Sequence, residues 1–306
     1  MIQGLLREIA AQGARGAVVP FTRIDDLKKD MLALKNGAFH TVWLDRMANH
    51  ITTDTNPFIP PGLTFTPRSL ISVVIPSAPA LLRFSYHGQP VDCVVPAHYI
   101  NWEMKNQQVL QGLTDRLAPR GFCVAMAVTL PQKLLAVHCG LARYGRNNIA
   151  YHDEFGSHTQ IMTYISDLPC GEAAWFPLER MGHCETCRAC VSACPTAAID
   201  ASRRLIDANR CLTFMNEFPE WLDPSAHNSI IGCTKCQDCC PANAQNRDNT
   251  AVGATFTEAE TAEILSHQEG TPYLSALAEK IGALGISPEF VRFFPRNLSV
   301  LLKNKQ

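Results

Sequence analysis

The cysteines of this chain are distributed very unevenly. Of the 13 cysteines in 306 residues, nine fall between Cys184 and Cys240. The other four are scattered singly: Cys93, Cys123, Cys139 and Cys170. Closely spaced cysteines that are kept reduced are typical of metal centres. The dense segment therefore constrains the fold most, because its loops must bring several thiolates to common points.

Charge and hydropathy narrow the class of protein. The chain has 27 Lys and Arg against 28 Asp and Glu, and 46% of its residues are apolar. A net charge close to zero argues against a protein whose main task is to bind the phosphate backbone of nucleic acid, so no nucleic-acid partner is expected. No apolar run reaches the length of a membrane span, and residues 1–16 lack the pattern of a signal peptide. These features predict a cytoplasmic protein with no membrane partner.

The first dense cysteine run has the spacing of a bacterial two-cluster ferredoxin. Cys184, Cys187, Cys190 and Cys194, followed by Pro195, form C-x2-C-x2-C-x3-C-P. In that arrangement, three closely spaced thiolates bind one [4Fe–4S] cluster and the fourth binds the other. A structural zinc site is the alternative, but zinc ligands more often come as two pairs separated by a longer span. The run therefore predicts two [4Fe–4S] clusters.

The second run completes the ligand sets. Cys240 precedes a proline as Cys194 does, so the two Cys-Pro residues are expected to exchange between the clusters. Cys211 and Cys239 both compete for the last place, and we favour Cys211 because adjacent side chains such as those of Cys239 and Cys240 usually diverge. The predicted ligands are Cys184, Cys187, Cys190 and Cys240 for cluster 1, and Cys194, Cys211, Cys233 and Cys236 for cluster 2.

The scattered cysteines and Cys239 have a simpler interpretation. Free cysteine commonly behaves as a small, buried apolar residue. We therefore expect the four single cysteines to be core residues and Cys239 to be an uncoordinated thiol.

Hydrophobic periodicity predicts mixed elements before the dense segment and helices after it. We expect helices at 2–9, 102–117 and 131–140, strands at 17–19, 70–75 and 121–128, and helix starts at Thr257, Thr271 and Ser287. The predicted domains are an α/β module at 1–178, a double-cluster ferredoxin-like domain at 179–248, and a helical segment at 249–306 that packs on the first module.

Several segments resemble one known family. The segments 184–199 (CETCRACVSACPTAAI), 210–213 (RCLT) and 232–243 (GCTKCQDCCPAN) look like the double-cluster module of epoxyqueuosine reductase and its relatives. Outside that module, 139–148 (CGLARYGRNN) is similar to the family segment AGLGWIGKN, and Arg296-Asn297-Leu298 resembles a family RNL motif. The likeness covers most of 65–304, and the cluster cysteines are its most specific part.

The resemblance implies an α+β fold and a cofactor. The first module would be related to the nitroreductase-like fold and to cobalamin-dependent reductive dehalogenases. It would hold cobalamin, which the clusters would reduce, and in this chain Tyr144, Gly145 and Asn147 would be the candidate cofactor contacts. An electron donor such as ferredoxin or flavodoxin would supply the clusters, and a small-molecule substrate would receive the electrons.

The chain also departs from the family pattern. The family carries a proton-donor aspartate ahead of AGLGW, whereas the corresponding stretch, 124–133 (VAMAVTLPQK), has no acidic residue. A carboxyl group with a raised pKa is an effective general acid, and neither valine nor threonine replaces it. The sequence therefore indicates a divergent branch for which conversion of epoxyqueuosine in tRNA is not expected.

No catalytic residue can be assigned from the sequence. Polar side chains gather around the altered segment and could supply a proton or contact a cofactor, although an ordinary structural role is favoured for each: His138, Tyr144, Tyr151, His152 and Asp153. The leading hypothesis is an iron–sulfur oxidoreductase of the epoxyqueuosine-reductase-like type. The rival is an electron carrier or maturation partner without substrate chemistry of its own.

Overall fold

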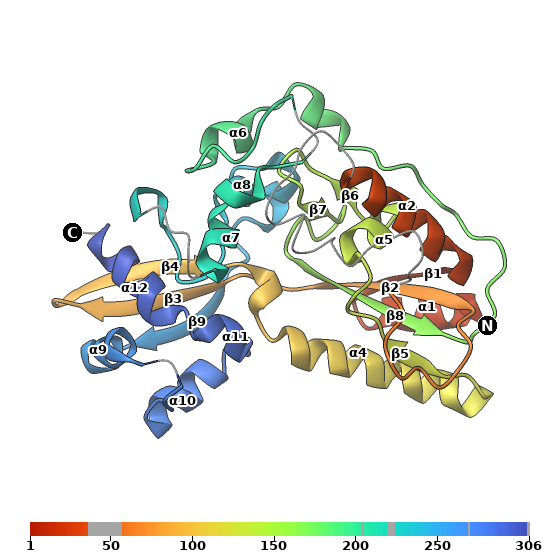
Figure 1. Ribbon diagram of the computed structural model, residues 1–306, viewed down its shortest axis with the longest axis horizontal. Helices are drawn as coiled ribbons and strands as arrows, with labels where there is room; N and C mark the ends of the chain where they lie inside the picture. Colours follow the sequence, from red (N-terminus) through yellow and green to blue (C-terminus); the bar gives the residue numbers. More distant parts are fainter. Residues whose placement is uncertain (36–56, 203–204, 219–223, 269, 305–306) are drawn as a thin grey trace. The chain divides into compact units, whose positions relative to one another are not determined.

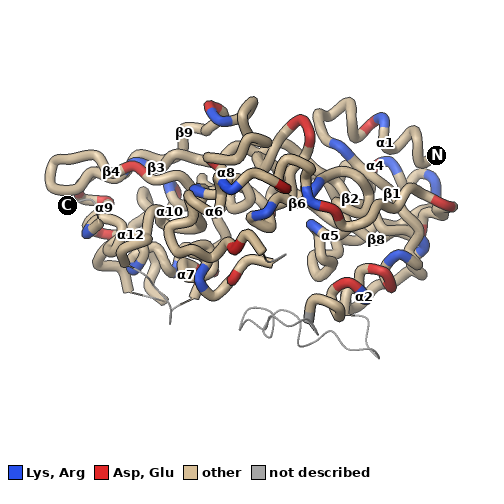
Figure 2. Tube along the Cα trace, turned by 90° about the horizontal axis from the view of Figure 1, so that it is seen from above, with Lys and Arg blue, Asp and Glu red and all other residues tan. Residues whose placement is uncertain are grey.

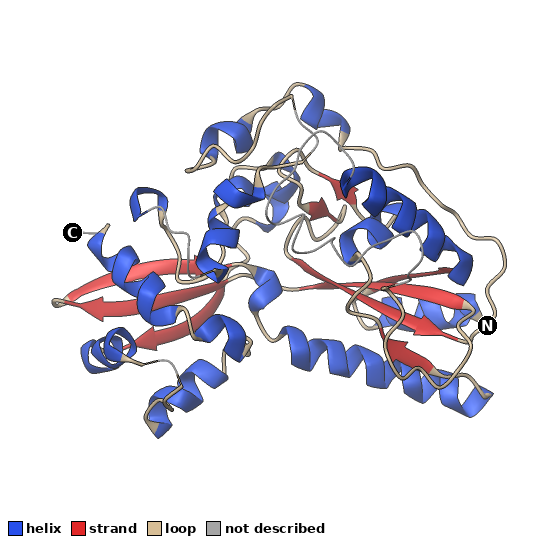
Figure 3. Ribbon diagram, viewed as in Figure 1, coloured by secondary structure: helices blue, strands red, loops and turns tan. Residues whose placement is uncertain are grey.

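The chain forms two compact units, and each is assembled from separate stretches of sequence. The computed structural model describes residues 1–35, 57–202, 205–218, 224–268 and 270–304. The first unit consists of Met1–Pro76, Lys105–Glu154 and Thr159–Glu185, and the second of Ser77–Met104, Phe155–His158 and Thr186–Gln306. Each unit has its own β-sheet with helices packed on it (Figures 1 and 3).

The sheet of the first unit is antiparallel throughout. Its strands are β1 (Arg15–Pro20), β2 (Ser69–Pro76), β8 (Thr159–Ser166) and β5 (Val124–Met126), in that spatial order. β2 and β8 are the central pair, and nearly all of their residues are buried. The apolar, β-branched sequence LISVVI suits a strand that is covered on both faces.

Helices cover both faces of this sheet. Leu70 packs in one cluster with residues of α2 (Ile24–Lys35) and α5 (Gln132–His138). Its neighbour Ile71 packs in another cluster with residues of α1 (Ile2–Ala11) and α4 (Trp102–Leu117). Successive strand residues point to opposite faces. The first unit is therefore a sheet between two helical layers.

The second unit has a smaller sheet. β3 (Ala80–Tyr86) and β4 (Gln89–Val95) form a hairpin whose turn residues His87 and Gly88 both have positive φ, as a type I′ turn requires. β9 (Ala251–Phe256) pairs in parallel with β3, and Phe84 stacks on Phe256 with ring centroids 4.7 Å apart. The core of this unit also takes in the last helices, α9 (Glu258–Ser266), α10 (Ser275–Gly282), α11 (Pro288–Val291) and α12 (Phe294–Lys303).

Short elements carry the cysteine runs. They are η4 (Gly182–Glu185), α6 (Ala189–Ala193), η5 (Ala208–Arg210), α7 (Leu212–Glu217), η6 (Pro224–Ala226), α8 (Lys235–Asp238) and η7 (Pro241–Asn246). α6 and α8, the helices of the two C-x2-C runs, pack against each other. The remaining short elements are η1 (Phe21–Arg23), η2 (Ala97–Tyr99), η3 (Ala118–Arg120), β6 (Arg143–Tyr144) and β7 (Ala150–Tyr151).

The sequence predicts most of these elements, but it does not predict the strand in segment 249–306 or the division of the chain into its two units. The capping box of Thr257 with Glu260 and the helix start at Pro288 are present, whereas α10 begins at Ser275 rather than near Thr271. The segment 249–306 was expected to be helical, but it begins with β9. The division into units also differs from the predicted boundaries, because 77–104 belong with the tail. The β3–β4 hairpin buries Leu82 and Phe84 only by packing with β9 and the late helices.

Two further observations bear on the surface. Positively and negatively charged residues are interspersed along the trace of both units (Figure 2). Among the described residues, no helix combines the length and the apolar character needed to cross a bilayer.

Candidate iron–sulfur site

Two of the four cysteines predicted for cluster 2 accept hydrogen bonds at sulfur. The backbone N–H of Ala198 donates to Sγ of Cys194 at 3.3 Å, and Nδ2 of Asn228 donates to Sγ of Cys233 at 3.5 Å. Cys211 is the N-cap residue of α7 and makes no cap hydrogen bond through its side chain, although the nearby backbone N–H groups of Thr213 and Phe214 oppose the rise in the pKa of its thiol. Donors of this kind stabilise a thiolate and are one of the factors that set cluster potentials.

The thiols of Cys194, Cys211 and Cys233 lie close enough for the charge of one to affect the pKa of another. Burial raises the pKa of Cys211, and the charge of Cys194 raises it further. Burial raises the pKa of Cys233 to about 11, with added contributions from Cys211 and Cys194. Buried thiols grouped in this way are costly to ionise together, and a bound cation removes that cost. Cys236, the fourth predicted ligand, lies on the neighbouring helix α8.

Cys239 has a different environment. Its Sγ contacts the backbone carbonyl of Cys236 at 3.7 Å, so its thiol acts as a donor within its own helical turn. A thiolate has no proton to donate. Burial and the neighbouring Cys240 both raise the pKa of Cys239. The hydrogen bond that its thiol donates, rather than the raised pKa, distinguishes Cys239 from Cys233, and it agrees with the uncoordinated thiol that we expect.

The cysteines predicted for cluster 1 are all at least partly buried. Cys184 lies in η4 of the first unit, whereas Cys187, Cys190 and Cys240 belong to the second. In the described part of the chain, no three His, Cys, Asp or Glu side chains converge as one metal ion would require. A cubane cluster binds each thiolate at a different iron, so its ligands need not converge on a single point.

The residues predicted to contact cobalamin lie together in one turn of the first unit. Nδ2 of Asn147 donates to the hydroxyl of Tyr151 at 2.8 Å, and a Cβ at Gly145 would lie 2.7 Å from the ring of Tyr151. Burial and the charge of Asp30 raise the pKa of the Tyr144 phenol. Tyr144 is half-buried, whereas Gly145 and Asn147 are buried in the first unit, and their contact with cobalamin stays a prediction.

This turn supports the first cluster cysteine. The backbone N–H of Met181 donates to the carbonyl of Tyr144 at 2.9 Å, and the N–H of Cys184 donates to the carbonyl of Met181 at 2.9 Å. The guanidinium of Arg146, which is 5% exposed, donates to the carbonyl of Cys184. The segment that resembles AGLGWIGKN thus positions the backbone of a predicted ligand.

We expect Arg146→Ala to weaken the site at Cys184. The substitution leaves a carbonyl without its charged donor, which destabilises a protein by about 1.5–3 kcal/mol. The chelator-induced iron-release rate and the melting temperature of the anaerobic protein measure the effect. Arg143→Ala is the control, because Arg143 forms an exposed ion pair with Asp153 and such pairs contribute little. Equal behaviour of the two variants would contradict a positioning role for Arg146.

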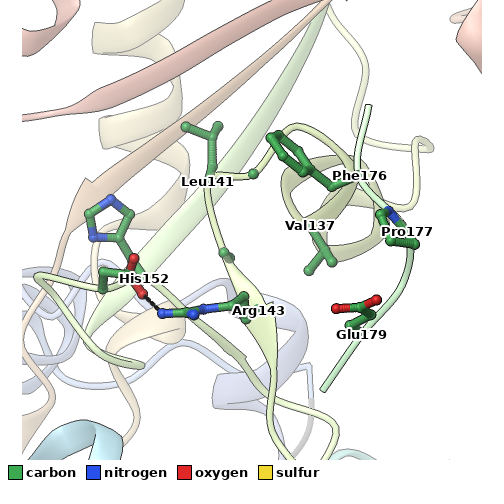
Figure 4. A pocket seen from close by; sticks show the side chains of 10 residues that line it. Val137, Leu141, Arg143, His152, Phe176, Pro177 and Glu179 are labelled. Carbon is green, nitrogen blue, oxygen red and sulfur yellow. Dashed lines mark hydrogen bonds and ion pairs between the residues drawn. The ribbon is translucent and has the colours of Figure 1, made fainter. Parts of the chain in front are cut away.

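A cavity of about 300 Å³ lies in the first unit beside the altered segment. Figure 4 shows Leu141, Arg143 and His152 on one side of it, and Phe176, Pro177 and Glu179 on the other. Burial, followed by the charge of Arg15, lowers the pKa of His152, so its imidazole is neutral near pH 7. The cavity is at the small end of the usual range for small-molecule pockets.

His138, another candidate proton donor or cofactor contact, is buried in the first unit, where both of its ring nitrogens have polar partners. Its Nδ1 lies 2.6 Å from the carbonyl of Phe176, and its Nε2 lies 2.7 Å from Oδ2 of Asp30. The ring also stacks on Trp175 at 4.3 Å. Because both ring nitrogens face oxygen acceptors, His138 ties α2, α5 and the segment at 175–176 together, which is the structural role favoured from sequence.

The single cysteines match the expected core role only in part. Cys93 is buried in the core of the second unit, and Cys139 and Cys170 pack half-buried at the edges of the first-unit clusters. Cys123 is exposed, contrary to expectation, because it follows the turn at Gly121 and precedes the short strand β5.

Sequence reasoning missed the groups that surround cluster 2 from distant segments. The hydroxyl of Tyr99 donates to Glu217 at the end of α7. Arg296 and Asn297, which were noted only as part of an RNL motif, donate to backbone carbonyls of α7. No local pattern reveals these partners, since they lie about 80 to 120 residues apart.

Comparisons with known proteins agree with the cysteine pattern. Residues 183–243 match the 4Fe-4S double cluster binding domain. An epoxyqueuosine reductase from Pseudomonas aeruginosa is 28% identical over 193 residues, which cover 57% of this chain and 52% of that protein. The chain therefore matches about half the length of this curated relative.

Solved structures extend the likeness to almost the whole chain. Epoxyqueuosine reductase from Bacillus subtilis, with its aspartate-bearing catalytic loop swung out of the active site, aligns with a TM-score of 0.69 and 19% identity, over 99% of this chain and 81% of that one. This chain has the epoxyqueuosine reductase fold. Another epoxyqueuosine reductase, solved with an epoxyqueuosine-modified tRNA stem loop, aligns with a TM-score of 0.65 and 16% identity, over 99% and 82%. The predicted resemblance to an epoxyqueuosine-reductase-like iron–sulfur protein is confirmed in both sequence and fold.

Proposed function

We propose that this chain is a cytoplasmic iron–sulfur oxidoreductase in which two [4Fe–4S] clusters deliver electrons to a small-molecule substrate. The observation that carries the proposal is the group of Cys194, Cys211 and Cys233. The sulfurs of Cys194 and Cys233 accept hydrogen bonds, and neighbouring thiols of the group raise the pKa of Cys211 and Cys233. This environment suits thiolates that share a cluster, and it supports Cys211 over Cys239 as the remaining ligand.

The chain's own residues would hold and tune the clusters. When bound, a [4Fe–4S] cluster supplies one-electron transfer. The hydrogen bond from Asn228 opposes the rise in the pKa of Cys233 and so assists its ligation as a thiolate. Within the first unit, Arg146 donates a hydrogen bond to the carbonyl of Cys184 and so holds its backbone in place. The packing of α6 against α8 brings the two C-x2-C runs together.

The substrate is proposed to be small and polar. The cavity beside Arg143, His152 and Glu179 has the size and lining for such a molecule. One solved relative binds a tRNA stem loop, but the balanced charge of this chain and the acid-free stretch at 124–133 support a different substrate. Cobalamin rests on the family resemblance alone, because Tyr144, Gly145 and Asn147 are packed in a turn. We therefore assign it no reaction step.

An electron carrier or maturation partner is the second candidate. It is favoured by the same acid-free stretch and by the altered segment at 139–148. A carrier would need the cluster region but would have no use for the lined cavity in the first unit.

Metal analysis of anaerobically purified protein tests these alternatives. We expect about eight irons and as much acid-labile sulfide per chain, since each cubane holds four irons. The visible spectrum with added cobalamin, together with cobalt analysis, separates the two candidates. Bound corrinoid would favour the reductase, and a full iron content without corrinoid affinity would favour the carrier. Stoichiometric zinc would contradict both, and tight, salt-sensitive binding of a tRNA stem loop would contradict a small-molecule substrate.

A further inference from the structure

A buried tyrosine and a glutamate form a hydrogen-bonded pair in the second unit. Tyr99 is the last residue of η2 and is 4% exposed, and its hydroxyl donates to Oε1 of Glu217, the last residue of α7. The rings of Tyr99 and Phe290 pack edge to face, with their centroids 5.2 Å apart. The hydrogen bond to Glu217 and the contact with Phe290 therefore both fix the position of the Tyr99 ring.

The ring of Tyr99 lies against the loop that leads into Cys233. A Cβ at Gly232 would come within 2.7 Å of Cε2 of Tyr99, so only glycine fits there. Nδ2 of Asn216, the neighbour of Glu217, donates to the carbonyl of Gly232 at 2.9 Å. The pair is thus packed directly onto the segment that carries a predicted ligand of cluster 2.

Electrostatics link the pair to the same cluster. Burial raises the pKa of Tyr99 most, followed by Glu217, and the charges of Cys211 and Cys233 add to the effect. A negative charge on these thiolates is therefore felt at the tyrosine hydroxyl that contacts Glu217. An electron added to a centre bound by Cys211 and Cys233 would place a further negative charge beside these two thiolates.

The charges that face Glu217 come from three elements. Burial raises the pKa of its carboxyl to about 7, the Tyr99 hydrogen bond opposes that rise, and Glu289 of α11 adds to it. Arg296 of α12 faces the end of α7, where it donates to the carbonyls of Met215 and Asn216 at 3.1 and 3.0 Å. The carboxyl is therefore poised between its charged and neutral forms near physiological pH.

We propose that Glu217 takes up a proton whenever the centre bound by Cys211 and Cys233 gains an electron. This inference rests on the proposed function. A one-electron donor of the ferredoxin class supplies the electron, and solvent supplies the proton that forms an O–H bond on the carboxylate. Because the added charge favours the neutral acid, reduction and protonation assist each other. When the centre is oxidised again, the proton returns to solvent, so the net charge near α7 changes little.

The sign of the coupling defines its pH window. Below about pH 7 Glu217 is already protonated in the oxidised protein, so the potential should not depend on pH. Above that value, reduction requires proton uptake and the potential should fall as pH rises. The limit is a tenfold change in the reduction equilibrium per pH unit, which is about 59 mV for a one-electron couple.

Redox titrations of the anaerobic protein between pH 6 and 9, followed by EPR, test the proposal. We expect one of the two centres to show the pH-dependent potential, and Glu217→Gln to make that potential independent of pH. Tyr99→Phe should move the onset to higher pH, because it removes the hydrogen bond that lowers the pKa of Glu217. Glu289→Gln is the matched control, since it removes an exposed carboxylate. It should keep the slope and move the onset to lower pH, because Glu289 raises the pKa of Glu217.

The outcomes separate this proposal from the proposed function. A full iron content with two pH-independent potentials would overturn the coupling and leave the iron–sulfur assignment intact. A slope that persists in Glu217→Gln would also overturn it, and so would an onset that Tyr99→Phe does not move. A protein without iron–sulfur clusters would overturn both. Iron analysis of each variant distinguishes a lost coupling from a lost cluster, and Tyr99→Phe provides a second test if Glu217→Gln does not fold.

Discussion

Cys211→Ala is expected to remove about four of about eight irons per chain, because one cubane loses a ligand. Cys239→Ala is expected to retain them all. The contrast follows from the sulfur environments. The Cys211 thiol lies at the start of α7, close enough to Cys194 and Cys233 for their charges to be coupled to it. The Cys239 thiol instead contacts the carbonyl of Cys236 at 3.7 Å.

Iron and acid-labile sulfide, measured per chain after anaerobic purification, give the answer directly. Cys123→Ala is a suitable control, since it removes an exposed thiol remote in sequence from both cysteine runs. EPR of the reduced protein should show one signal in Cys211→Ala and two in the control. The opposite result, with iron lost only from Cys239→Ala, would show that the ligand assignment of cluster 2 is wrong.

The sequence predicts the cluster cysteines because their geometry is local. Three residues or fewer separate successive thiols of the first run, so the spacing alone restricts how Cys184, Cys187 and Cys190 can be arranged. The burial of β2 on both faces is also predictable, because its apolar run is continuous. In both cases the information lies within a few residues of the feature it predicts.

The environment of the clusters depends on contacts between distant segments. Tyr99 reaches Glu217 only because η2 follows the β3–β4 hairpin, which joins β9 and the late helices in one core. β9 itself was missed, since Ala251–Phe256 pairs with a strand about 170 residues earlier. At 144–147 the similarity to a family motif predicts a cofactor contact, and this stays a prediction. Within the first unit, Asn147 donates to the hydroxyl of Tyr151.

Asn297→Asp is expected to destabilise the second unit severely. Asn297 is 0% exposed, and its Nδ2 donates to the carbonyls of Asn216 at 3.0 Å and Ile230 at 2.8 Å. The substitution changes the shape of the side chain very little, but it places a carboxylate oxygen against two carbonyl oxygens. Two lost hydrogen bonds and a buried charge together cost at least about 3 kcal/mol. For a protein of this size, that lowers the melting temperature by something on the order of 6–12 °C.

The effect should depend on pH with a defined sign. Burial and the two facing carbonyl oxygens raise the pKa of the introduced carboxyl in the folded state, against the opposing effect of Arg296, whose Nε donates to Oδ1 of Asn297 at 3.0 Å. The protonated form can again donate one hydrogen bond. The deficit should therefore shrink as pH falls from 8 towards 5, because the folded state then binds the proton more tightly than the unfolded chain. Thermal unfolding of the anaerobic protein, followed by circular dichroism across this range, measures it. Asn249→Asp, an exposed counterpart, should melt like the wild type at every pH. A deficit of equal size in both variants, or one that does not change with pH, would mean that Asn297 is not the link between α12, α7 and the loop at Ile230.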